Sequence, residues 1–227
     1  DAAAQHEGSS FDAQAAGPGD GAAWERAFVR LADALDAAKD GDEIWVAAGV
    51  YYPSDSADRE ASFALKPGVA LYGGFASGES RLDQRDWENN PTVLSGDIGR
   101  RGDDSDNAYH VVRGADGAVL DGFRISGGNS LGAGPAGRGG APGAGAAIGR
   151  RPMGPSGGGI HTTPDRVMQG GGAGAGGGML NFQCAPTVRH CVFENNQAAK
   201  GGAVYNMTGD GFPPRPGQAP KTPVFID

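Results

Sequence analysis

The chain has 227 residues, enough for one sizeable domain with a buried core. Its net charge of −8 argues against a nucleic-acid-binding protein, because a phosphate backbone requires a basic protein surface. The sequence has no run of about eighteen apolar residues, so it predicts no membrane-spanning helix.

The beginning of the chain predicts a leader and then a helix. Residues 1–20 are rich in Ala, Gly and Ser, which is typical of an extended leader segment. An amphipathic helix is expected at about residues 21–39, with Asp20 as its N-cap and Gly41 as its stop signal. Its large apolar side chains recur at steps of four, three and four residues: Trp24, Phe28, Leu31 and Leu35.

Short extended runs, separated by Gly and Pro turn signals, are predicted in the next part of the chain. They are residues 44–46, 50–52, 62–65, 69–72, 93–95, 109–112 and 119–125. The pair Gly73-Gly74 is interpreted as a corner that has no room for side chains. Residues 76–92 contain charges of both signs, so we expect a loop that ion pairs and Arg-to-carbonyl hydrogen bonds hold on the outside of the fold.

The densest acidic cluster lies in the sequence SGDIGRRGDDSDN, which begins at Ser95. Its carboxylates Asp103, Asp104 and Asp106 are candidate calcium ligands, because calcium binds about six to eight oxygen atoms. Their spacing does not match a complete calcium-binding loop, so a solvated turn is the competing interpretation. No other cofactor is expected, and no catalytic residue is assigned.

The regular pattern stops at about residues 129–177. Glycine makes up 42 of the 227 residues, and much of it is concentrated in two blocks of this segment. Such a composition offers few apolar side chains to set against a large chain entropy. The sequence therefore predicts an insertion that loops out between two structural repeats.

Residues 188–206, VRHCVFENNQAAKGGAVYN, determine the expected fold class. Two short apolar runs are separated by an Asn pair and by a Gly-rich corner rather than by a hairpin turn. Asn tolerates left-handed φ and can bond the backbone, and Gly lacks a Cβ, so both suit corners. Two short apolar runs joined by such corners are typical of one turn of a parallel β-solenoid. The motif residues that define it are Phe193, Asn196, Gly201, Gly202 and Ala203.

The end of the chain partly repeats this stretch. The sequence PTVRHC at residues 186–191 is echoed by TPVFID at residues 222–227. We therefore expect the natural protein to continue beyond Asp227. In that case Phe225 and Ile226 belong to a strand that can pair with a partner.

These residues resemble a known family. Phe193-Glu194-Asn195-Asn196 matches an F-x-x-N repeat and Gly201-Gly202-Ala203-Val204 a G-G-A-[ILV] repeat, the two motifs of chlamydial polymorphic outer-membrane proteins. The order of GDEIWVAAGVYYP, LYGGF, DQRDW, LSGD and LDGFRISGG is similar to that in bacterial pectin-lyase-like proteins. The resemblance implies a right-handed parallel β-helix, an all-β fold, with residues 21–227 as one domain. The helix at about residues 21–39 would then cover the open first turn.

Other candidate residues are few. Cys184 and Cys191 either form a disulfide or are two buried, inward-facing side chains. No two of the four His residues have the spacing of metal ligands. The pair Arg150 and Arg151 is a candidate for contacts with a partner.

The function expected from the sequence is structural, adhesive or an assembly role for a non-catalytic protein, secreted or on the exterior of the bacterial outer membrane. Its partners would be other protein subunits, copies of itself or cell-surface components, with polysaccharide as a further candidate. The alternative is a polysaccharide lyase or a glycoside hydrolase, since the same fold is found in enzymes and in inert shafts.

Overall fold

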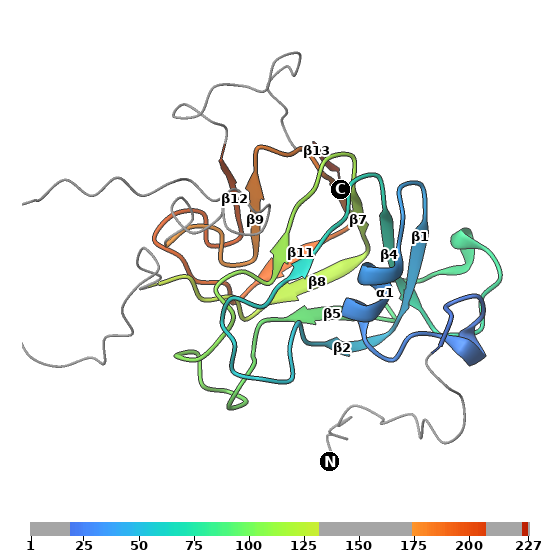
Figure 1. Cartoon of the computed structure of the whole chain (residues 1–227), viewed down its shortest axis with the longest axis horizontal. Helices are drawn as coiled ribbons and strands as arrows, with labels where there is room; N and C mark the ends of the chain where they lie inside the picture. Colours follow the sequence, from blue (N-terminus) through green and yellow to red (C-terminus); the bar gives the residue numbers. More distant parts are fainter. Residues whose placement is uncertain (1–18, 132–173, 208–223, 227) are drawn as a thin grey trace, which may run out of the picture.

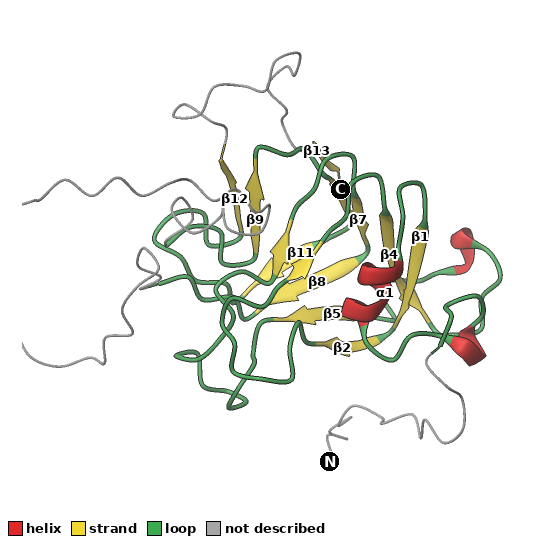
Figure 2. Ribbon diagram, viewed as in Figure 1, coloured by secondary structure: helices red, strands yellow, loops and turns green. Residues whose placement is uncertain are grey.

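The computed structural model describes residues 19–131 and 174–207, together with the backbone of residues 224–226. Its described part contains thirteen short strands, one α-helix and two 3-10 turns, at Trp24–Arg26 and Leu82–Gln84 (Figure 2). The α-helix, α1 (Leu31–Ala37), has seven residues. No helix among the described residues is long and apolar enough to cross a membrane.

All strands belong to three parallel sheets, and each sheet takes every third strand of the chain. The first contains β1 (Glu43–Ala47), β4 (Ala70–Phe75), β7 (Val119–Asp121), β10 (Thr187–Arg189) and β13 (Val224–Ile226). The second contains β2 (Gly49–Tyr51), β5 (Thr92–Ser95), β8 (Phe123–Ser126) and β11 (Val192–Glu194). The third contains β3 (Phe63–Ala64), β6 (Val112–Arg113), β9 (Met179–Phe182) and β12 (Val204–Met207).

The chain thus visits the three sheets in turn and advances by one layer with each circuit (Figure 1). The strand order and the parallel pairing confirm the expected all-β parallel solenoid. Strand β13 pairs with β10, Thr187 opposite Val224 and Arg189 opposite Ile226, so the end of the chain adds a strand to the first sheet as expected. The pairing differs by one residue from the sequence repeat, which aligned Val224 with Val188, because the structure places Phe225 opposite Val188.

Inward side chains of successive layers stack in three rows. The rows are Ile44, Leu71, Leu120 and Val188; Tyr51, Leu94, Ile125 and Phe193; and Phe63, Val112, Met179 and Val204. Most of these side chains are fully buried. Side chains alternate between the two faces of a strand, so the row is preserved only if neighbouring layers keep the same register.

The Asn corner expected after Phe193 is present. Asn195 has φ +53° and lies in the layer next to Gly127, which has φ +74°. The Asn196 side chain accepts a hydrogen bond from the Gly128 amide at 2.9 Å and donates one to the Ile125 carbonyl at 2.8 Å. It therefore connects its own layer to the preceding one.

The corner Gly201-Gly202-Ala203 also has a counterpart one layer earlier. Strands β9 and β12 pair with Met179 opposite Val204, so Gly176-Gly177-Gly178 occupies the same corner before β9. Asn129 bridges to Gln197, and Ala175 bridges to Lys200. The expected insertion of residues 129–177 was thus too long at both ends, because its Gly-rich C-terminal part is a repeat of the coil.

The helix expected at about residues 21–39 is largely wrong in extent. Only residues 31–37 are α-helical, and Asp20 accepts a hydrogen bond from the Ala22 amide and pairs with Arg26 instead of capping a helix. Trp24 lies outside the helix and packs on Phe75, with 5.5 Å between ring centroids. Helix α1 still buries its apolar face, Leu31, Ala34 and Leu35, and contacts β1 and β3 at the first layer.

Two strand predictions also need correction. Gly73-Gly74 is not a corner but lies inside β4, where Gly74 has φ +94° and the pairing with β1 shifts register, as in a β-bulge. The extended run at residues 119–125 is two strands, separated by a sharp corner at Gly122 with φ +85°.

We expect Leu120→Ala to lower the free energy of unfolding by about 2 to 5 kcal/mol, because it leaves a cavity in the middle of the first inward row. Leu120 has no exposed surface. Urea denaturation followed by circular dichroism measures the change. Val192→Ala, at an outward position that is 45% exposed, is the matched control and should change stability by less than about 0.5 kcal/mol. Equal losses in the two variants would contradict the layered core.

Candidate functional site

A buried ion pair holds the loop between β4 and β5 against the first sheet. Arg85 Nη2 lies 2.9 Å from Asp121 Oδ1, and the two side chains are only 8% and 5% exposed. Arg85 Nη1 also donates to the carbonyls of Gly73 at 3.3 Å and Asp121 at 3.1 Å. The loop predicted from the mixed charges of residues 76–92, fastened by an ion pair and Arg-to-carbonyl bonds, is confirmed.

His190 joins the same carboxylate from the next layer. Its Nδ1 donates to Asp121 Oδ1 at 2.8 Å, and the same oxygen atom forms the ion pair with Arg85. The imidazole stacks on Trp87 at 4.3 Å between ring centroids, and the Arg85 guanidinium lies 4.8 Å from the Trp87 ring. We call Arg85, Trp87, Asp121 and His190 the Asp121 cluster.

The corner geometry explains why these side chains meet. His190 has φ +46° and lies one layer above Gly122, at the turn from the first sheet into the second. A Cβ on Gly122 would stand 2.9 Å from Arg85 Nη1 and 3.0 Å from the Gly73 carbonyl oxygen. Glycine at this position therefore lets Arg85 reach Asp121, while a left-handed residue in the next layer directs the imidazole over Trp87.

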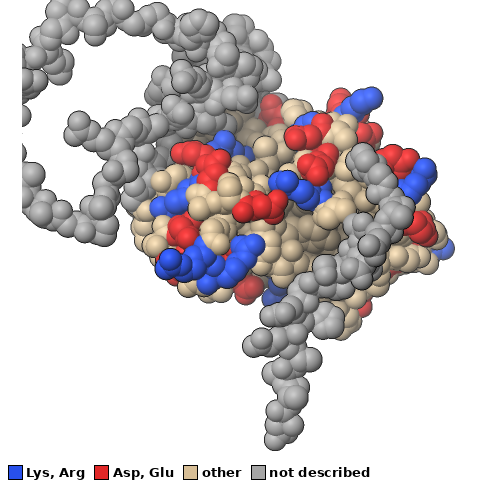
Figure 3. Space-filling model, turned by 60° about the horizontal axis from the view of Figure 1, so that its bottom comes forward, with Lys and Arg blue, Asp and Glu red and all other residues tan. Residues whose placement is uncertain are grey.

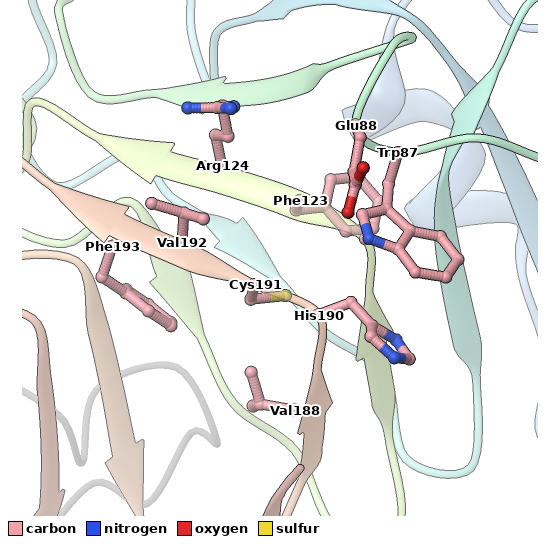
Figure 4. A pocket seen from close by; sticks show the side chains of 10 residues that line it. Trp87, Glu88, Phe123, Arg124, Val188, His190, Cys191, Val192 and Phe193 are labelled. Carbon is pink, nitrogen blue, oxygen red and sulfur yellow. The ribbon is translucent and has the colours of Figure 1, made fainter. Parts of the chain in front are cut away.

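A hollow of about 440 Å³ lies beside the cluster (Figure 4). Trp87, Glu88, Arg124, His190 and Val192 line its outer part. Among the described residues, no hydrogen bond or ion pair engages the Arg124 guanidinium, the Glu88 carboxylate or His190 Nε2. These groups are therefore the ones that a molecule in the hollow could contact.

The rest of the lining consists of side chains that belong to the hydrophobic core or pack against it, namely Phe123, Val188, Cys191 and Phe193. The lining residues come from the loop before β5, from β8 and from β11, and the last two are paired strands of the second sheet. The hollow is thus a groove beside the corner between the first and second sheets.

Cys191 is not a nucleophile in this groove. Burial raises the pKa of its thiol to about 12, and Sγ donates to the Leu120 carbonyl at 3.5 Å. The thiol is therefore protonated at neutral pH. No disulfide joins Cys184 to Cys191, so the disulfide interpretation is wrong, and Cys191 is the inward-facing side chain that the alternative proposed.

The acidic cluster does not form the expected calcium site. Asp103 accepts from the Ser105 amide and hydroxyl, Asp104 from the Asn107 and Gln197 amides, and Asp106 from the Arg100 amide. In the described part of the chain, no three His, Cys, Asp or Glu side chains are grouped so that they could hold a metal ion. The three carboxylates instead bind neighbouring donors separately.

Two of the predicted partner-binding residues, Arg150 and Arg151, lie outside the described residues. The other two, Phe225 and Ile226, are in β13 at the end of the first sheet, and their backbone alone is described.

The sequence patterns did not predict the Asp121 cluster. The signal that could have found it is the alignment of LDGF at Leu120 with VRHC at Val188, which places His190 over Gly122 and Cys191 over Phe123. That alignment requires the layer register, which composition and spacing alone did not supply.

No protein-family model, no curated protein and no solved structure matches the chain. The function must therefore be inferred from the residues and contacts of the chain itself.

We expect Asp121→Asn to lower the free energy of unfolding by about 3 to 5 kcal/mol, because the buried Arg85 guanidinium loses its counter-ion. Thermal or urea unfolding would show this loss. Asp83→Asn provides the matched control: its partner is Arg81, and both side chains are 69% exposed, so the cost should be below about 1 kcal/mol. A loss at Asp121 no larger than that at Asp83 would contradict the fastening role.

His110 should make stability depend on pH. Its side chain is buried, Nδ1 donates to the Gly176 carbonyl at 2.9 Å, and burial lowers its pKa below the 6.5 of the unfolded chain. As the pH falls, His110 is protonated in the unfolded chain before it is protonated in the folded one. The contribution of neutral His110 to the free energy of unfolding is therefore fully present above about pH 6.5 and is lost as the pH falls toward the lowered pKa of the folded state. Urea midpoints between pH 8 and pH 5 should fall less steeply for His110→Asn than for the wild type. Identical slopes would rule out this contribution.

Proposed function

We propose that the chain is part of a secreted or cell-surface bacterial protein whose coil is a right-handed parallel β-helix of the pectin-lyase-like kind. Right-handedness is supported by the strong preference for that hand in connections between parallel strands of one sheet. The pectin-lyase-like assignment is supported by Asn196 and Gly201, which occupy the corners that the F-x-x-N and G-G-A-[ILV] repeats require.

The proposed role is structural or adhesive, and the Asp121 cluster is the observation on which it depends. A catalytic carboxylate must reach its substrate. Asp121 is instead almost fully buried, paired with Arg85 and bonded to His190, so that it links the layers of the coil. This buried carboxylate thus stabilises the scaffold.

The outer surface supports the same proposal. Along the second sheet, the outward row consists of Val50, Val93, Arg124 and Val192. Figure 3 shows Lys and Arg interspersed with Asp and Glu over one face, with other residues between them. Dispersed charges on a regular surface suit binding to other subunits, to cell-surface components or to polysaccharide by shape.

One observation favours the alternative, a polysaccharide lyase or a glycoside hydrolase. His190 is oriented by a buried carboxylate, as a general base is in many enzymes, and it borders a groove with Trp87, Glu88 and Arg124. The enzyme hypothesis therefore assigns His190 as the base.

The two functions are separated by an activity assay on the intact chain. Acidic and neutral polysaccharides are incubated with the protein, and unsaturated products and new reducing ends are measured. We expect no more product than with heat-denatured protein. Product that disappears with His190→Gln, in a variant whose circular dichroism is unchanged, would overturn the structural role.

Location is tested independently. An antibody against the chain should label intact, unpermeabilised cells of the source organism or detect the protein in the culture medium. Labelling only after permeabilisation, with no protein in the medium, would contradict the proposed location.

A further inference from the structure

The loop between β5 and β6 contains a well-defined turn at Arg100–Asp103. The Asp103 amide donates to the Arg100 carbonyl at 3.0 Å, and Gly102 has φ +80°. These are the hydrogen bond and the third-position φ of a type II β-turn. The tip of the turn therefore displays Arg101 and Asp103, a guanidinium and a carboxylate, on either side of a glycine.

Contacts from both sides hold the turn in place. The Gly102 amide donates to both carboxylate oxygens of Asp97, at 3.0 and 3.1 Å. The Arg100 amide donates to Asp106 Oδ2 at 2.9 Å. A partner that bound this turn would lose little conformational entropy, because the backbone is already ordered.

Arg101 keeps its hydrogen-bonding edge available. Its guanidinium carbon lies 3.4 Å from the centroid of the Tyr52 ring, so the flat face of the group is stacked. Within the described ranges, no carboxylate pairs with Arg101. The N–H groups at the edge of a stacked guanidinium still point outward and can bind an acidic group in bidentate fashion.

Asp103 likewise has an available oxygen. Its Oδ1 accepts from Ser105, whereas Oδ2 makes no hydrogen bond among the described residues and only a long ion pair, 3.9 Å, with the exposed Arg100 side chain. The hydrogen bond from the Ser105 side chain lowers the pKa of Asp103, so the carboxylate stays ionised. Its side chain is 36% exposed.

We propose that Arg101-Gly102-Asp103 is a docking turn for a cell-surface protein receptor that holds a divalent cation next to an acidic pocket. Asp103 Oδ2 would complete the coordination of the receptor's cation, because hard divalent cations bind carboxylate oxygens. Arg101 would pair with the acidic pocket. The inference deepens the adhesive part of the proposed function and rests on it.

The charge pattern selects this class of partner. A purely acidic surface would attract Arg100 and Arg101 but repel Asp97 and Asp103, and a purely basic one would do the reverse. Only a partner with a cationic and an acidic group at neighbouring positions satisfies both ends of the turn.

Cell adhesion tests the proposal with the full chain coated on a surface. Cultured mammalian fibroblasts should adhere in buffer with magnesium and manganese, and EDTA should release them. A soluble Arg-Gly-Asp-Ser peptide should compete, whereas Arg-Gly-Glu-Ser should not. Asp103→Glu and Arg101→Lys keep the charges but change their reach and fork geometry, and each should weaken adhesion at least about tenfold.

Asp104→Glu and Arg100→Lys, the same changes at neighbouring residues, are the matched controls and should adhere like the wild type. Adhesion that survives EDTA but is lost at high salt would overturn the proposal in favour of non-specific charge attraction. Equal adhesion of Asp103→Glu and the wild type, or no adhesion at all, would overturn it too. If the antibody labels intact source cells in that case, the docking turn fails while the proposed function stands.

Discussion

The whole structure depends on parallel register between layers. Inward apolar side chains of neighbouring layers stack on one another. Leu120, for example, lies between Leu71 of the preceding layer and Val188 of the following one. A slip of one residue would turn an entire inward row outward, so the buried rows fix the register of all three sheets. Segments between strands are free of this constraint, and the loops after β4 and β5, at residues 76–91 and 96–111, have the same length but different sequences.

The Asp121 cluster adds a second, polar link between layers. Gly73, Asp121 and His190 belong to successive layers, and Arg85 and Trp87 from one loop contact all three. Removing charges from water costs free energy, which the short ion pair, the two carbonyl acceptors and the ring contacts offset. The main effect of the Arg85–Asp121 ion pair is therefore to fix the loop over one particular corner of the coil. Its net contribution to the free energy of unfolding is small by comparison. Such specificity suits a scaffold that must present its outer surface in one arrangement.

The sequence predicted those features of the fold that depend on the local chemistry of a few neighbouring residues. Asn195 and Gly201 have left-handed φ, and the Asn196 side chain bonds two backbone groups. Few residue types satisfy these requirements, so the corners could be placed before the structure was known. Trp24 and Gly74 could not, because tertiary contacts determine them: Trp24 leaves the helical pattern to pack on Phe75, and Gly74 forms a bulge inside a strand. The Asp121 cluster joins residues up to 105 positions apart by number, from Arg85 to His190, so only the register could bring them together.

The corner that joins β8 to β9 has one more consequence. Ser130 and Gly176, on either side of a long intervening segment, are bonded to Gln197 and Lys200 of the following layer. With both attachment points fixed, the closure entropy of the intervening chain grows only logarithmically, by about 0.6 kcal/mol for each doubling of its length. The coil can therefore tolerate changes of size and sequence at this position during evolution, and it offers protein engineers a natural place to graft a foreign peptide or domain.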